Sequence, residues 1–376
     1  MAVSLRSSGI PSGMSLPDSS THGTTGFVPD VDLELSAKPT SNEILPGLMT
    51  GVWSYRGRLL QGRAGTLEES GSYLGPTIRL HRGDRVRIRF RNELPDSTIV
   101  HWHGLTVPAL MDGHPRLVIA SGKDYVYEFE VRNRAGQYWY HPHPDQRTGA
   151  QIYRGLAGLL FVHDEEEASL RLPSGENEIP LVIQDRAFQS NELVYISGRM
   201  DAMTGFLGDK ILVNGKTDHE LTLSTGVYRL RILNASNSRI YKLAWSNKIP
   251  FTIIGTDGGL LEKPLRKPYL TISPAERVDV LVDLSNEAAG SSLELRSGGF
   301  HAAQMMMGRG MMGGGMMGGM SRNTYGGLEQ GSEFKILSVR VVKKEKSNFR
   351  IPNRLSQPGF RNLNGAESPD KARVFN

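Results

Sequence analysis

Two short His-X-His segments constrain this chain more than any other feature. They are His101-Trp102-His103 and His141-Pro142-His143. In an extended strand successive side chains point to opposite faces, so the two imidazoles of each pair project to the same side, roughly 6 to 7 Å apart. Trp102 must point the other way, toward a core, and Pro142 places its segment at a strand end or edge because it lacks an N–H donor. Each pair therefore predicts half of a metal site.

The chemistry of the ligands narrows the choice of metal. Four neutral imidazoles suit copper or zinc, and the general affinity order puts copper above zinc for the same ligands. The chain has no cysteine, which excludes disulfides, zinc–thiolate sites, iron–sulfur sites and the thiolate ligand of a blue-copper centre. Copper is the favoured metal, and zinc stays open at this point.

Length, charge and the N-terminal composition bound the remaining possibilities. A chain of 376 residues is expected to form two domains. The net charge is +5, and no basic cluster is interleaved with aromatic residues, so nucleic acid is not an expected partner. Residues 1–30 are rich in Ser, Gly and Pro and predict a disordered leader without the apolar segment of a signal peptide. No apolar run is long enough to predict a membrane span.

Short alternating runs indicate an all-β protein. The first expected strand is residues 31–39. In residues 85–92 apolar and polar side chains alternate clearly, so that Val86, Ile88 and Phe90 share one face. Helical periodicity is not sustained anywhere. We therefore predict a β-sandwich over 31–165, a polar linker over 166–180 and a second all-β unit over 181–346.

A Met-rich loop interrupts the second unit. Residues 305–320 contain eight of the 14 methionines, spaced by glycines that argue against a helix or a packed core. Thioethers are soft donors suited to Cu(I) or Ag(I), although the segment could equally be a low-complexity insertion. The candidate ligands are Met305, Met306, Met307, Met311, Met312, Met316, Met317 and Met320.

A series of short motifs follows in order along the chain. They are Gly75-Pro76-Thr77-Ile78-Arg79, Arg82-Gly83-Asp84, His101-Trp102-His103-Gly104, Asp112-Gly113, Tyr138-Trp139-Tyr140-His141-Pro142-His143, Gly155-Leu156-Ala157-Gly158, Leu212-Val213-Asn214-Gly215, Arg229-Leu230-Arg231-Ile232-Leu233-Asn234, Asp257-Gly258-Gly259 and Pro274-Ala275-Glu276-Arg277. This ordered set resembles the multicopper oxidase family, in particular bacterial copper-efflux and laccase-like oxidases. The resemblance covers about residues 50–345 and implies two tandem cupredoxin-like Greek-key β-sandwich domains.

The resemblance also implies roles for individual residues. His101 matches a ligand of type 2 copper, and His103, His141 and His143 match ligands of the type 3 copper pair. Asp112 matches an acidic residue that delivers protons during oxygen reduction, and it could also be an ordinary turn residue before Gly113. Copper ions and dioxygen are the implied partners.

One part of the family pattern is missing from this sequence. Three-domain members carry a His-Cys-His segment and the type 1 copper ligands in a third domain, whereas residues 347–376 resemble only a linker toward that domain. We therefore expect an incomplete oxidase that acts on Cu(I) or phenolic substrates, with a second chain as one source of the third domain. The alternatives are a non-catalytic copper- or silver-binding protein and a structural remnant. The family is usually periplasmic or extracellular, and the location of this chain stays open.

Overall fold

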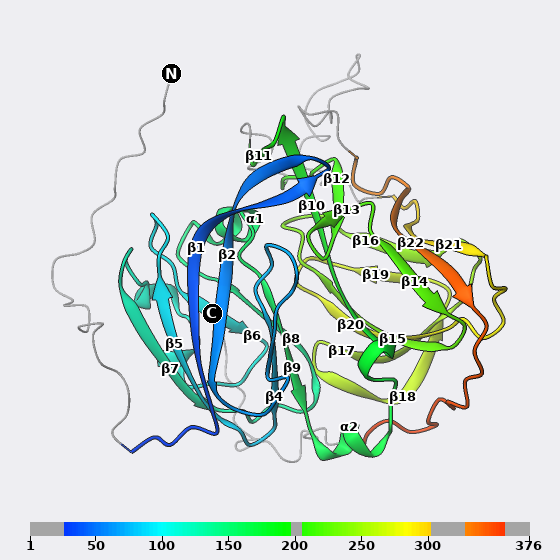
Figure 1. Ribbon diagram of the computed structural model, residues 1–376, viewed down its shortest axis with the longest axis horizontal. Coiled ribbons are helices and arrows are strands. Elements are labelled where there is room, and N and C mark those ends of the chain that lie inside the picture. Colours follow the sequence, from blue (N-terminus) through cyan, green and yellow to red (C-terminus); the bar gives the residue numbers. More distant parts are fainter. Residues whose placement is uncertain (1–25, 197–204, 302–327, 358–376) are drawn as a thin grey trace, which may run out of the picture.

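The described residues fold into two adjacent β-sandwiches, which agrees with the all-β prediction (Figure 1). The computed structural model describes residues 26–196, 205–301 and 328–357. The predicted leader before residue 26, the Met-rich loop and the end of the chain after residue 357 lie outside these ranges. Among the described residues no helix has the length and apolar character needed to span a lipid bilayer.

The first sandwich consists of a four-stranded and a five-stranded sheet. The four-stranded sheet has the order β2-β1-β5-β7 and the other has the order β3-β4-β9-β8-β6. The strands are β1 (Val31–Leu45), β2 (Leu48–Gln61), β3 (Leu67–Glu68), β4 (Thr77–His81), β5 (Arg85–Asn92), β6 (Val100–His103), β7 (Asp124–Glu130), β8 (Gly136–Pro142) and β9 (Gly158–His163).

The second sandwich pairs an eight-stranded sheet with a five-stranded one. The larger sheet contains β10 (Glu178–Gln189), β11 (Glu192–Val194), β12 (Lys210–Val213), β13 (Lys216–Thr217), β15 (Val227–Asn234), β17 (Phe251–Thr256), β18 (Gly259–Lys267) and β20 (Arg277–Asp283). The smaller sheet contains β14 (Glu220–Ser224), β16 (Tyr241–Trp245), β19 (Leu270–Ile272), β21 (Ser292–Ser297) and β22 (Phe334–Lys343).

Helices are short and lie in the connections. They are α1 (Thr148–Tyr153), α2 (Glu165–Ser169) and the 3-10 turns η1 (Ala109–Met111), η2 (Pro115–Leu117) and η3 (Gly175–Asn177). Asp164 is the N-cap of α2, and its carboxylate accepts a hydrogen bond of 2.8 Å from the Glu167 N–H, as expected for an acidic N-cap.

Strand β1 runs past Pro39, where the sequence pattern predicted it to end. The pairing of β1 with β5 covers only Val31 to Ala37, so residues after Ala37 have a ladder partner on one side, the strand β2. A proline on a stretch with one free edge leaves no ladder hydrogen bond unmade. The hairpin of β1 and β2 therefore continues and reaches the second sandwich, where β1 contacts β13 and β2 contacts β11 (Figure 1).

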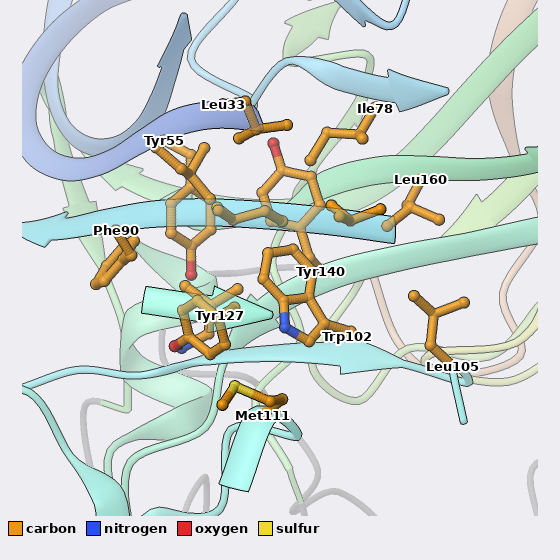
Figure 2. Packing of buried hydrophobic residues seen from close by; sticks show 14 of the residues in the cluster. Leu33, Tyr55, Ile78, Phe90, Trp102, Leu105, Met111, Tyr127, Tyr140 and Leu160 are labelled. Atoms are coloured by element: carbon orange, nitrogen blue, oxygen red, sulfur yellow. The ribbon is translucent and has the colours of Figure 1, made fainter. Parts of the chain in front are cut away.

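An aromatic cluster fills the core of the first sandwich (Figure 2). Trp102 is fully buried, and its ring lies 5.2 Å from the Tyr127 ring in an edge-to-face arrangement and 5.8 Å from the Tyr140 ring. Such pairs stabilise a core beyond the area that they bury. The prediction that Trp102 faces the core is confirmed, and His101 and His103 consequently lie on the opposite face of β6.

The two sandwiches share a junction that is partly apolar and partly ionic. The apolar part includes Trp139, Leu159 and Phe161 from the first sandwich and Leu212 and Leu233 from the second. The ionic part connects residues of β4, α2, β10, β15 and β20 through side chains that are buried except for the partly exposed Arg79, and its members are Arg79, Glu167, Glu178, Arg229, Arg231 and Asp279.

Glu167 is the member of this ionic group with the clearest electrostatic signature. Its side chain is 7% exposed and accepts hydrogen bonds of 2.7 Å from His163 Nδ1 and Arg229 Nη2. Burial by itself raises the pKa of a carboxyl group, but the His163 hydrogen bond and the charges of Arg229 and Arg231 outweigh burial and lower the pKa of Glu167 to about 2.

The substitution Glu167→Gln tests this ionic group through its pH dependence. The folded-state pKa lies below the ordinary value of 4.5, so the ionised side chain stabilises the fold fully above about pH 4.5 and less as the pH falls toward 2. We expect the variant to lose roughly 3 kcal/mol at pH 7 and the difference from the wild type to shrink below pH 4, as measured by urea unfolding. Glu165→Gln, an exposed position in the same helix, is the control, and a pH-independent difference would contradict this account.

Candidate metal centre

Pairing between β6 and β8 brings the two His-X-His segments together. The strands are antiparallel, with His101 opposite His141 and His103 opposite Trp139. Pro142 is the last residue of β8, which agrees with its predicted place at a strand end. His143 follows the strand, and its backbone N–H donates to the Ile99 carbonyl over 3.1 Å.

All four predicted histidines lie close together. The centroid of the His101 ring lies 5.6 Å from that of His103, 5.2 Å from that of His141 and 5.4 Å from that of His143. One ring nitrogen from each of His101, His103 and His141 falls within 4.8 Å of the others, and this is the one such cluster of potential metal ligands in the part of the chain that the structure describes. The geometry joins residues that are 40 positions apart.

Backbone carbonyls fix the tautomers of two of these rings. His101 Nδ1 lies 2.6 Å from the Asp112 carbonyl oxygen, and His141 Nδ1 lies 2.9 Å from the Pro142 carbonyl oxygen. A carbonyl oxygen can only accept, so both Nδ1 atoms carry the proton and donate it. The lone pair of each ring is therefore on Nε2, the atom that would bind a metal.

The surroundings keep the inner rings uncharged. Burial lowers the pKa of His103 to about 4, with further contributions from the positive charge of Arg277 and from the neighbouring imidazoles. Burial likewise lowers the pKa of His141 well below its usual range. Metal binding requires the neutral imidazole, so the residues present suit a metal.

Further contacts agree with this fit. His103 Nδ1 and His141 Nε2 face each other at 3.2 Å. His143 Nδ1 is buried without a hydrogen-bond partner among the described residues. Ring nitrogens in such positions are what an imidazole metal site requires, and an all-nitrogen donor set suits copper or zinc.

Asp112 lies beside the cluster. Its carboxylate Oδ1 is 3.3 Å from His101 Nδ1, and its side chain is 45% exposed. The side chain therefore connects the histidines with solvent, while the backbone carbonyl of the same residue orients His101. The predicted methionine ligands lie outside the described residues.

Trp139 is a contact of the site that the sequence interpretation overlooked. Its ring is tilted against the His103 ring at 5.2 Å and against the His141 ring at 4.2 Å, and it is 3% exposed. Trp139 precedes His141 by two positions in the same strand, so the period of two that places the histidines also places this indole on their face.

Comparison with known proteins shows which protein family has this arrangement of sandwiches and histidines. Two models described as "Multicopper oxidase" match residues 59–167 and 189–292. The structure of the McoA multicopper oxidase from the hyperthermophile Aquifex aeolicus is similar with a TM-score of 0.74 and 33% identity, covering 90% of this chain and 68% of that one. The fold is thus the cupredoxin-like β-sandwich, and the chain belongs to the multicopper oxidase family.

Two curated relatives with different names are similar to this chain. Multicopper oxidase mco of Staphylococcus aureus is 41% identical over 220 residues, which make up 58% of this chain and 49% of that protein. Cell division protein FtsP of Edwardsiella tarda is 37% identical over 267 residues, which make up 68% of this chain and 55% of that protein. The chain spans about half the length of each of these relatives.

The turn after Asp112 predicts a specific sensitivity. Gly113 has a φ of +78°, and a Cβ there would press on the Val100 carbonyl and lie 2.7 Å from the His101 Cα. Gly122 has a φ of +73°, and a Cβ there would meet no described atom within 4 Å, so Gly122→Ala measures backbone strain alone, about 1–2 kcal/mol. We expect Gly113→Ala to cost about 2–5 kcal/mol by thermal unfolding and to shift the nitrogen resonances of His101. Equal costs for the two variants would show that the packing against β6 has no role.

Proposed function

We propose that this chain supplies a copper-binding half of a multicopper oxidase centre. His101 is the proposed ligand of type 2 copper, and His103, His141 and His143 are the proposed ligands of the type 3 pair. The observation that carries the proposal is the convergence of three imidazole nitrogens within 4.8 Å. Copper held by these residues would supply the redox chemistry that couples oxidation of a reduced substrate to the reduction of dioxygen to water.

Within this proposal the chain's own residues orient the ligands and move protons. The Asp112 and Pro142 carbonyls hold His101 and His141 in the tautomer that presents Nε2. The half-exposed Asp112 carboxylate takes protons from solvent and holds them within 3.3 Å of His101 Nδ1. The reduction of dioxygen consumes protons, so a carboxylate in this position serves as the relay.

This sequence lacks the cysteine of a type 1 copper site, the site at which electrons would enter such an oxidase. A type 1 copper site requires a cysteine thiolate, and the 376 residues include none. We therefore propose that oxidation of Cu(I) or of a phenolic substrate depends on ligands contributed by a further domain or chain. The names of the oxidase relatives support an oxidase reaction, and they do not identify its substrate.

A second candidate is copper or silver binding without turnover. The absence of cysteine and the likeness to a protein named for cell division both favour it. In this version the four histidines bind the metal, and the soft thioethers of 305–320 hold Cu(I) or Ag(I).

Copper titration of the purified chain tests copper binding by the histidines, which both proposed functions require. We expect the wild type to bind Cu(II) with the paramagnetic resonance signal of nitrogen-ligated type 2 copper. His103→Ala and His141→Ala should each weaken binding more than about 10-fold, because each removes a donor that the strand pairing places in the cluster. His219→Ala, a half-buried histidine of the second sandwich, is the control. Equal Cu(II) affinity in all four proteins would refute the proposal that these histidines form half of a copper site.

Oxygen consumption tests the proposal that turnover requires ligands from a further domain or chain. We expect the copper-loaded chain, given a methoxylated phenol and a chelator for unbound copper, to consume oxygen no faster than the His103→Ala variant treated in the same way. The physical reason is the missing thiolate entry point for electrons. Faster consumption by the wild type, measured with an oxygen electrode, would show that this chain turns over without further ligands.

A further inference from the structure

Arg277, the first residue of β20, extends from the second sandwich into the first. Its Nε donates to the Gln137 carbonyl of β8 over 3.2 Å. Its Nη1 and Nη2 donate to the Ala275 and Asp257 carbonyls, each over 3.2 Å, and Nη1 lies 2.9 Å from the Asp257 carboxylate. The side chain is 4% exposed. One planar guanidinium thus holds three backbone carbonyls, one of them in the neighbouring sandwich.

These contacts adjoin both histidine strands. Gln137 lies in β8, the strand that also carries Trp139 and His141. Gly104 directly follows His103, and a Cβ at that glycine would lie 2.8 Å from Arg277 Nη2 and 3.0 Å from Tyr138 Cδ1. The left-handed backbone of Gly104, with a φ of +89°, lets the end of β6 approach the guanidinium this closely.

The start of β8 packs on the second sandwich along its backbone as well. A Cβ on Gly136 would lie 3.1 Å from the Gly259 Cα, and a Cβ on Gly259 would lie 2.6 Å from the Ala135 carbonyl oxygen. The strands β17, β18 and β20 all contact β8. The position of β8 is therefore set from both sandwiches, and the hydrogen bond from Arg277 Nε to the Gln137 carbonyl is part of that contact.

We propose that Arg277 is a positioning residue for the histidine cluster, acting through Gln137 in β8 and Gly104 at the end of β6. The inference rests on the proposed copper half-site. Binding several imidazoles to one centre requires their strands to keep a fixed separation, and contacts behind the ligands hold that geometry. Lysine keeps the charge but lacks the planar fork, so it cannot reach three carbonyls at once.

The experiment must exclude the alternative that Arg277 only stabilises the fold. Arg239 is a matched buried arginine whose contacts lie within the second sandwich. It donates to the Gly208 and Leu328 carbonyls over 2.7 and 2.8 Å and pairs with the Asp185 carboxylate. Arg239→Lys therefore measures what the loss of a carbonyl-binding guanidinium does to the fold without touching β6 or β8.

Cu(II) titration with paramagnetic resonance spectra of the copper-loaded full chain tests the proposal. We expect Arg277→Lys and Arg277→Met each to weaken Cu(II) binding about 10- to 100-fold and to change the copper hyperfine splitting. Arg239→Lys should lower the unfolding temperature to a similar extent while the affinity and the spectrum stay as in the wild type. If Arg277→Met does not fold, the comparison of the two lysine variants decides.

Three outcomes would overturn the proposal. Unchanged affinity and spectrum in the Arg277 variants would show that the guanidinium does not position the ligands. A wild-type result for Arg277→Lys with a loss only in Arg277→Met would assign the effect to charge and not to the carbonyl contacts. An equal change in Arg239→Lys would assign it to general stability. Failure of the wild-type chain to bind Cu(II) is a different result, because it removes the proposed half-site itself.

Discussion

The register between β6 and β8 is the constraint on which the histidine cluster depends. It sets His101 opposite His141 and Trp102 opposite Tyr140. A slip of one residue would turn every side chain of β6 to the other face. It would bring Trp102, now fully buried, out of the aromatic core and move His101 into it. Burial of a large indole is worth several times the thermal energy, so the core on one face of the sheet holds the histidines in place on the other.

The local part of this arrangement could be predicted from the sequence. The period of two in a strand was sufficient to orient His101, His103 and Trp102, and the same rule applied to β8 would have found Trp139 on the histidine face. The period contains no information about which strands are neighbours. The pairing of β6 with β8 spans the 32 residues 104–135, which form β7 and the loops that hold η1 and η2, and it results from packing of the whole sandwich. The resemblance to a family supplied that step.

Other features lay beyond local patterns for reasons that are equally physical. Pro39 is compatible with a long β1 because the strand has one partner there, and the number of partners is a property of the sheet. Charged residues such as Glu167 and Arg277 are ordinarily solvated. They are buried here because two sandwiches meet over them, and each has a partner on a segment distant in sequence, Arg229 for Glu167 and Gln137 for Arg277.

The junction also explains why the second sandwich matters to a cluster whose four histidines all belong to the first. Residues of β8 are buried along the whole strand, with β9 and β6 on its two edges and the second sandwich against its first residues. Close-packed interiors transmit displacement because they have little free volume to absorb it. A shift of β20 or of the turn between β17 and β18 would therefore move the backbone that carries Trp139 and His141. The histidine geometry is in this sense a property of both sandwiches, and this accounts for a buried guanidinium that joins them next to the site.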